Sequence, residues 1–194
     1  MAGTNKVEQG GTLKSENDKD TVITNQKTDT ASSHTVTIDA EDHKVEVTLD
    51  NVNIKADSGS ALTSKGDVTL TLKGDNHLTG GNGDTYGGDG ITSSGSLTIY
   101  GGENDSLTAK GGSGADGYGG DGIRSGGVVT ISGNTVNAAG GYGGKVGGYG
   151  ICSFDRVAIS GGTVEAAGGN GSTGGDGIYS SGVTVSDGTV TATG

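Results

Sequence analysis

The sequence predicts an all-β protein whose chain winds into a parallel β-helix of about six coils, with three short strands in each coil. The first observation is a repeat: Gly-Asp-Gly-Ile stands at 88–91, 120–123 and 175–178, and Gly-Tyr-Gly-Ile stands at 148–151. The second is that short segments of alternating apolar and polar residues follow each copy. A unit of this length cannot bury an apolar face alone, so successive copies are expected to stack. The absence of proline suits strands that are hydrogen-bonded along both edges.

The first strand of each coil begins at the last residue of the repeat, and a serine follows two residues later. These inward pairs are Ile91 and Ser93, Ile123 and Ser125, Ile151 and Ser153, and Ile178 and Ser180, with Leu62 and Ser64 as a weaker copy. Because a buried hydroxyl needs a partner, we expect each serine to bond to the hydroxyls above and below it. The single cysteine, Cys152, follows inward Ile151 and is therefore expected to point outward.

The second and third strands are predicted by period-two alternation, which is typical of a strand with one buried face. The second strands are expected at 68–70, 97–99, 129–131, 157–159 and 183–185. The third strands contain the equivalent positions Val52, Leu78, Leu107, Val136, Val164 and Val190. Their separations of 26 to 29 residues predict the length of one coil.

The chain is predicted to divide into a polar N-terminal leader or cap over 1–35 and the β-helix over 36–194. Two alternating patches, at 21–23 and 36–38, are expected to form strands that cover the open end of the helix. The repeat pattern runs to the C-terminal residues without a capping segment. This predicts either continuation into further domains or an end-to-end homo-oligomer.

Charge and composition exclude two classes of partner. The net charge is −11, and arginine occurs only at 124 and 156, which opposes binding to a phosphate backbone. No apolar run approaches the length of a membrane span. We therefore expect neither nucleic-acid binding nor membrane insertion.

Four glycine-rich loops, at 80–88, 111–120, 140–148 and 168–175, are expected to share one corner of the helix and to form a ridge. Glycine there allows positive φ and close approach of backbones. The ridge and its border hold candidate sugar-binding residues, because tyrosine rings cover the apolar face of a pyranose and polar groups bond to its hydroxyls. These candidates are Tyr86, Tyr118, Tyr142, Tyr149, Asp84, Asp116 and Lys145. The alternative is that the tyrosines stack on one another and shield the glycine backbone.

A column of aspartates, Asp89, Asp121 and Asp176, recurs in the second position of the repeat, with Tyr149 in the fourth copy. Like charges on neighbouring coils repel, so the column predicts either a cation, for which Ca²⁺ suits carboxylate ligands, or backbone partners. The alternative to a metal site is an Asx-turn, in which each aspartate bonds to its own glycine backbone.

Several phrases resemble the glycine-rich parallel β-helix domains, described as carbohydrate-binding, of Gram-positive bacterial surface proteins. They are residues 47–54 (Val-Thr-Leu-Asp-Asn-Val-Asn-Ile), Ser-Gly-Ser-Ala at 58–61, and the cycle of Gly-Gly, Gly-Ile, Leu-Thr-Ile and Gly-Thr-Val-x-Ala. The resemblance covers roughly residues 36–194. It implies a right-handed helix of the polysaccharide-lyase architecture that binds a plant polysaccharide such as cellulose or pectin, with Ca²⁺, outside the cell.

Together these observations predict a non-catalytic, extracellular or cell-surface domain that binds carbohydrate or acts as an adhesin. Three alternatives stay open. The first is a structural or self-assembling surface element or phage fibre, and the second is ice binding by an outward threonine column that Ala158 interrupts. The third is a polysaccharide lyase, for which a basic residue near carboxylates is needed. Arg124 beside Asp121, or Lys145, would be the candidate base.

Overall fold

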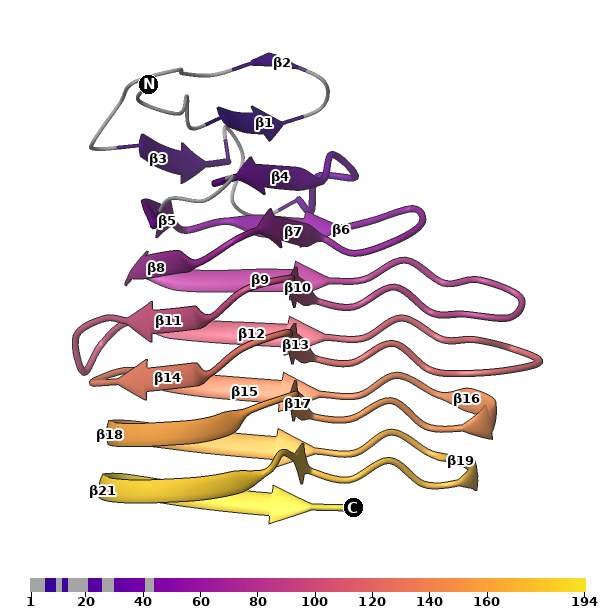
Figure 1. Cartoon of the computed structure of the whole chain (residues 1–194). Coiled ribbons are helices and arrows are strands. Elements are labelled where there is room, and N and C mark those ends of the chain that lie inside the picture. The colour runs from indigo at the N-terminus through magenta and orange to yellow at the C-terminus, as the bar shows by residue number, and fades with distance from the viewer. Residues whose placement is uncertain (1–5, 10–11, 14–20, 26–29, 41–43) are drawn as a thin grey trace.

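The chain forms a parallel β-solenoid of about six turns, which confirms the predicted fold class. The computed structural model describes residues 6–9, 12–13, 21–25, 30–40 and 44–194. Figure 1 shows the coils stacked one beneath another from the N-terminal to the C-terminal end, with long loops leaving each coil on the same side. Every described coil is built from strands, and each strand pairs with the equivalent strand of the next coil.

Three rows of stacked strands make up the coils. The first row consists of β4 (Val36–Asp39), β7 (Leu62–Lys65), β10 (Ile91–Ser93), β13 (Ile123–Ser125), β17 (Ile151–Ser153) and β20 (Ile178–Tyr179). The second row consists of β3 (Thr21–Thr24), β5 (Val45–Asp50), β8 (Val68–Lys73), β11 (Leu97–Tyr100) and β14 (Val129–Ser132). The third row consists of β6 (Asn53–Lys55), β9 (Asp75–Thr79), β12 (Ser106–Lys110) and β15 (Thr135–Ala139).

Two longer strands, β18 (Arg156–Ala167) and β21 (Gly182–Thr193), run through the turn and belong to both the second and the third row. In Figure 1 the second-row strands lie in front and the third-row strands return behind them. The side chains between the rows form one apolar core, in which isoleucine, leucine and valine stack on their equivalents. Because strands alternate their side chains, the other half of each strand faces outward.

The predicted register is wrong in one coil of the third row. Asn76, not Leu78, pairs with Leu107 and shares the row of Val52, whereas Leu78 pairs with Ala109. Asn76 lies 24 residues after Val52 and 31 before Leu107, so this coil is offset by two residues. The offset is tolerated because the Asn76 side chain, although completely buried, is fully bonded. Its Oδ1 accepts the Val52 N–H at 2.9 Å, and its Nδ2 donates to three carbonyls.

The N-terminal end of the solenoid carries extra strands. β1 (Lys6–Gln9) pairs antiparallel with both β4 and β2 (Thr12–Leu13), whereas β3 pairs in parallel with β5. The strands expected at 21–23 and 36–38 are therefore present as β3 and β4. Much of the predicted polar leader, including 14–20, lies outside the described residues.

The four glycine loops form a thin double layer beside the solenoid, visible at the right of Figure 1. In each loop an outgoing and a returning limb are joined by backbone hydrogen bonds that continue from coil to coil. The N–H of Gly112 donates to Gly88, that of Gly120 to Gly112, and that of Gly141 to Gly120, at 2.7 to 2.9 Å. Strands β16 (Gly143–Val146) and β19 (Gly171–Thr173) pair at the outer end. The expected continuous ridge is present.

The loop glycines are required for close approach and not for positive φ. The described glycines with positive φ lie at 59, 66, 74, 133, 161, 162 and 188, all outside the four loops. Within the loops, a Cβ on Gly88, Gly120 or Gly148 would overlap the carbonyl of the equivalent glycine in the preceding coil. Of the two expected reasons for glycine, only close backbone packing applies in these loops.

Candidate functional site: a groove and the residues around it

A groove of about 360 Å³ lies on the outer face of the third row. Two rows of side chains line it, and both run along the axis of the solenoid. One of these two rows of side chains is polar and consists of Thr108, Asn137, Glu165 and Thr191. The other row of side chains consists of the strand-ending residues Lys110, Ala139, Ala167 and Thr193. We call this site the third-row groove.

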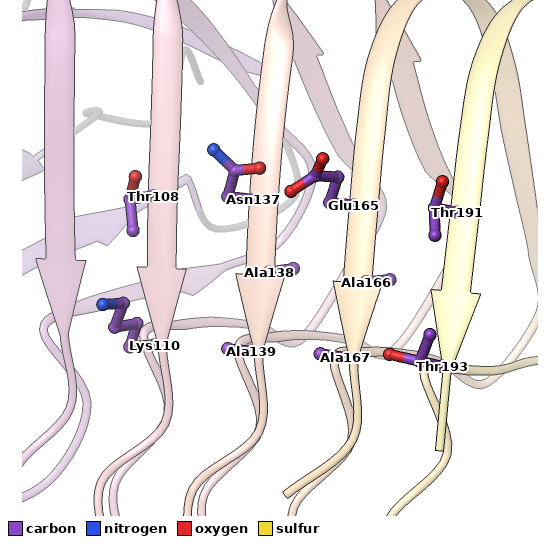
Figure 2. A pocket seen from close by; sticks show the side chains of 10 residues that line it. All are labelled: Thr108, Lys110, Asn137, Ala138, Ala139, Glu165, Ala166, Ala167, Thr191 and Thr193. Carbon is purple, nitrogen blue, oxygen red and sulfur yellow. The ribbon is translucent and has the colours of Figure 1, made fainter.

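The groove is hollow because the short side chains of two alanines lie between longer side chains. Figure 2 shows Ala139 and Ala167 between the longer side chains of Lys110 at one end and Thr193 at the other. The polar row beside them places an amide, a carboxylate and two hydroxyls on successive coils, about 4.8 Å apart. A linear ligand lying along the axis would therefore meet one hydrogen-bonding side chain per coil.

The sequence-predicted sugar residues lie elsewhere, mostly at the outer end of the glycine loops. Tyr86 and Tyr118 stack with their ring centroids 5.5 Å apart and their planes 9° apart. Val146 takes the equivalent place in the next loop, so the stack has two rings. Tyr86 remains 70% exposed. The alternative of stacked tyrosines thus holds for this pair, and sugar contact by these rings stays a prediction.

The other predicted sugar residues lie at three places along the glycine loops, and sugar binding by them stays a prediction. Asp84 and Asp116 are aligned at the turns of successive loops, where the Asp116 N–H donates to the Asp84 carbonyl at 2.7 Å. Lys145 occupies the turn of the next loop, and all three side chains are exposed. Tyr142 stands on the outgoing limb of its loop, where its carbonyl accepts the Gly114 N–H, whereas Tyr86 and Tyr118 stand on returning limbs. Tyr149 lies at the inner end of a loop.

The aspartate column joins neighbouring coils by bonds from side chain to backbone. Asp89 Oδ1 accepts the N–H of Asp121, and Asp121 Oδ1 accepts the N–H of Tyr149, both at 2.7 Å. Each carboxylate thus bonds to the equivalent residue of the following coil, so the expected Asx-turn to its own glycine is wrong for these two. Tyr149 interrupts the column before Asp176 and stacks on Tyr179, with ring centroids 4.9 Å apart.

Within the part of the chain that the structure describes, no three acidic, histidine or cysteine side chains gather as a metal site. Asp89 and Asp121 use their oxygens for neighbouring N–H and hydroxyl groups, whereas Asp176 is exposed. Binding of Ca²⁺ to Asp89, Asp121 and Asp176 stays a prediction.

Asp121 is the most strongly perturbed of these carboxyls. Its side chain is 5% exposed, and Arg124 Nη1 donates to its Oδ2 at 3.0 Å. Burial and then the charge of Asp89 raise the pKa of the Asp121 carboxyl from 3.8 to about 6. Arg124 also lies 5.0 Å above the Phe154 ring. Arg124, one of the two candidate lyase bases, is therefore held in an ion pair on the first row of strands, away from the third-row groove.

Cys152 lies in the row of outward-pointing residues, as expected, but it is covered there, with 1% of its surface exposed. It pairs in register with Arg124 on one side and Tyr179 on the other, and these larger side chains flank it. Burial and the nearby Asp121 carboxylate raise the pKa of the Cys152 thiol to about 11. The thiol is thus held in its protonated, unreactive form.

The raised pKa of Asp121 predicts that the protein gains stability as the pH falls from about 6 to about 4. Folding favours the protonated carboxyl in this range, so the free energy of unfolding decreases as pH rises through it. The pKa difference corresponds to at most about 3 kcal/mol. Urea unfolding at pH 4.5 and pH 7 measures the effect. Asp121→Asn should remove most of the pH dependence, and an unchanged dependence in this variant would contradict the assignment.

Sequence reasoning missed the third-row groove, although part of its signal was visible. The alternation marks Thr108, Asn137 and Glu165 as outward residues. The change from Lys110 to Ala139 and Ala167 at equivalent positions is the sign of a hollow. It could be recognised only after the register of the third row was known.

Comparisons with protein-family models, curated protein sequences and solved structures found no match to this chain. The parallel β-solenoid rests on the structure itself, and membership of the carbohydrate-binding family stays a prediction. Among the described residues, no helix has the length and apolar character needed to cross a bilayer.

Proposed function

We propose that this protein is a non-catalytic, extracellular carbohydrate-binding β-solenoid that holds a linear, neutral polysaccharide in the third-row groove. The observation that supports this most is the juxtaposition of a polar row with a hollow of small side chains. Asn137, Glu165 and the threonines offer donors and acceptors to sugar hydroxyls. Ala139 and Ala167 leave room for the sugar rings.

The charge of the protein favours a neutral polysaccharide over an acidic one. The chain carries a net charge of −11, and Glu165 stands in the middle of the groove. A polyuronate such as pectin would bring further negative charge to this surface, and like charges repel. Lys110, at one end of the groove, offsets only part of this charge. A cellulose-like glycan meets no such repulsion.

The third-row groove lacks the usual chemistry for cleaving a polysaccharide. Glycosidases commonly use two carboxyl groups on either side of the scissile bond. Among the residues that line the third-row groove, Glu165 supplies the single carboxylate. A lone carboxylate suits hydrogen bonding to hydroxyls.

Binding is tested with a soluble cello-oligosaccharide and with polygalacturonate by isothermal titration calorimetry. We expect binding of the neutral ligand, and Glu165→Ala should weaken it about 10-fold, since one hydrogen bond to a charged group contributes about 1.5 kcal/mol. Ala167→Phe should block the groove and abolish binding there. Glu103→Ala is the matched control, because Glu103 is also exposed but lies in a turn outside the groove. Failure of every neutral glycan to bind, or an equal loss in Glu103→Ala, would contradict the proposal.

A second candidate function, self-association, is favoured by one observation. Strand β21 pairs with β18 along one edge, and Val183 and Val185 remain 48% and 47% exposed. Such a long strand carries only one charged residue, Asp187, to oppose pairing with another chain. Sedimentation velocity separates the two functions, because self-association produces species that grow with protein concentration and glycan binding does not require them.

A further inference from the structure

The second row of strands carries a hollow of its own, on the opposite side of the coil from the third-row groove. It has a volume of about 460 Å³ and is lined by Lys44, Glu46, Thr69, Thr71, Thr98 and Tyr100. We call it the second-row hollow. In Figure 1 its strands β5, β8 and β11 lie in front of the third-row strands. Because the core lies between the two rows, their outer faces point away from each other.

The lining of the second-row hollow forms a floor with two raised ends. Thr69 and Thr98 are in register and form the floor, beside Thr71. Lys44 and Glu46 stand at one end, and Tyr100 stands two coils further along the axis, about 10 Å away. The Glu46 carboxylate accepts the Thr71 hydroxyl at 3.2 Å, which directs this side chain along the floor.

Tyr100 gives this hollow a feature that the third-row groove lacks. Its side chain is 55% exposed, and its partners in register are the smaller Thr71 and Ser132. The two ring stacks of the described chain involve Tyr86 with Tyr118 and Tyr149 with Tyr179, so the Tyr100 ring does not belong to either. An exposed ring beside hydroxyls, a carboxylate and an ammonium group fits the apolar face of a pyranose together with its hydroxyls.

We propose that the second-row hollow is a second glycan site, in which a pyranose ring packs on Tyr100 and its hydroxyls bond to Glu46 and Thr98. This inference rests on the proposed function of the third-row groove. One short ligand cannot reach both sites, since they lie on opposite faces. The protein therefore binds two glycan segments at once and cross-links neighbouring polysaccharide chains, with the gain in apparent affinity that two linked sites provide.

The test combines stoichiometry with cross-linking. Calorimetry with a cello-oligosaccharide should give two ligands per wild-type chain, and one ligand in either Tyr100→Ala or the groove-blocking variant Ala167→Phe. The double variant should bind at least 100-fold more weakly than wild type. With a long soluble β-glucan, wild-type protein should form a viscous or turbid network, whereas each single variant should bind the glucan without joining chains.

Thr130→Ala is the control, because Thr130 continues the row of Thr98 one coil beyond the hollow. It should keep two ligands and the network. Stoichiometry of one in wild type, with Tyr100→Ala unchanged, would overturn the second site and leave the third-row groove standing. No binding of any neutral glycan by wild type would overturn the proposed function and this inference with it.

Discussion

Gly120→Ala is expected to destabilise the protein by about 3 kcal/mol or more, and to disrupt the double layer of glycine loops. A Cβ at this position would overlap the carbonyl of Gly88, which belongs to the backbone of the preceding coil and cannot move aside alone. Gly120 also donates its N–H to Gly112 and accepts from Gly141, so a shift would break bonds on both sides. Forced overlap with backbone is among the most damaging kinds of substitution.

Thermal and urea unfolding of Gly120→Ala measure the loss. The matched control is Gly182→Ala, because a Cβ on Gly182 would meet no atom within 4 Å and its φ is not in the left-handed region. This variant should unfold within about 0.5 kcal/mol of wild type. Equal stability of Gly120→Ala and wild type would contradict the close packing of the limbs.

The second large effect concerns two buried asparagines, for which the same substitution should have opposite signs. Asn76→Leu should destabilise the protein by about 3 kcal/mol, because it leaves the buried Val52 N–H without its acceptor and removes the bonds from the amide Nδ2 to three carbonyls. Asn134→Leu should stabilise it by about 1 kcal/mol. The Asn134 side chain is also buried, but neither its Oδ1 nor its Nδ2 has a hydrogen-bond partner among the residues that the structure describes.

Urea unfolding of both variants checks this pair. The prediction for Asn76 runs against the pattern of its own row, where Leu107 and Val136 are the equivalents and leucine would look like an improvement. A gain of stability in Asn76→Leu, or a loss in Asn134→Leu, would show that the bonding of these side chains has been misassigned.

The architecture could be predicted from the sequence because its signals repeat. Isoleucine at 91, 123 and 151 marks the first row, and the copies confirm one another. The register failed at Leu78 because one polar residue replaces an apolar one in the core, and the apolar pattern then favours the wrong alignment. Only the bonds of Asn76 reveal why the true register is stable.

The partners of repeated polar residues could not be predicted, because they depend on distances between coils. The serines were expected to bond to hydroxyls above and below. Instead Ser93, Ser125 and Ser153 donate to carbonyls of the turn in the preceding coil, at Gly66, Gly95 and Gly127. The aspartate column likewise bonds to the following coil.

The third-row groove could not be predicted from the sequence, for a related reason. The groove exists because the side chains of Ala139 and Ala167 are short, and two small residues do not form a recognisable sequence motif. The tyrosines attracted the prediction of a sugar site because they gather in and beside the glycine loops, yet Tyr86 stacks on Tyr118 and Tyr149 stacks on Tyr179. Residue types alone identified side chains that could contact a sugar. The position of the groove depended on how the third-row strands align from coil to coil.

The most direct test of the central claim is a map of backbone amide shifts by nuclear magnetic resonance during titration with a cello-oligosaccharide. Glycan binding in the third-row groove predicts the largest shifts in β12, β15, β18 and β21, near Asn137, Glu165 and Ala167. The second-row hollow predicts a separate set near Tyr100. Shifts confined to the loop turns around Tyr86 and Tyr118, or no shifts at saturating glycan, would contradict the claim that the groove binds glycan.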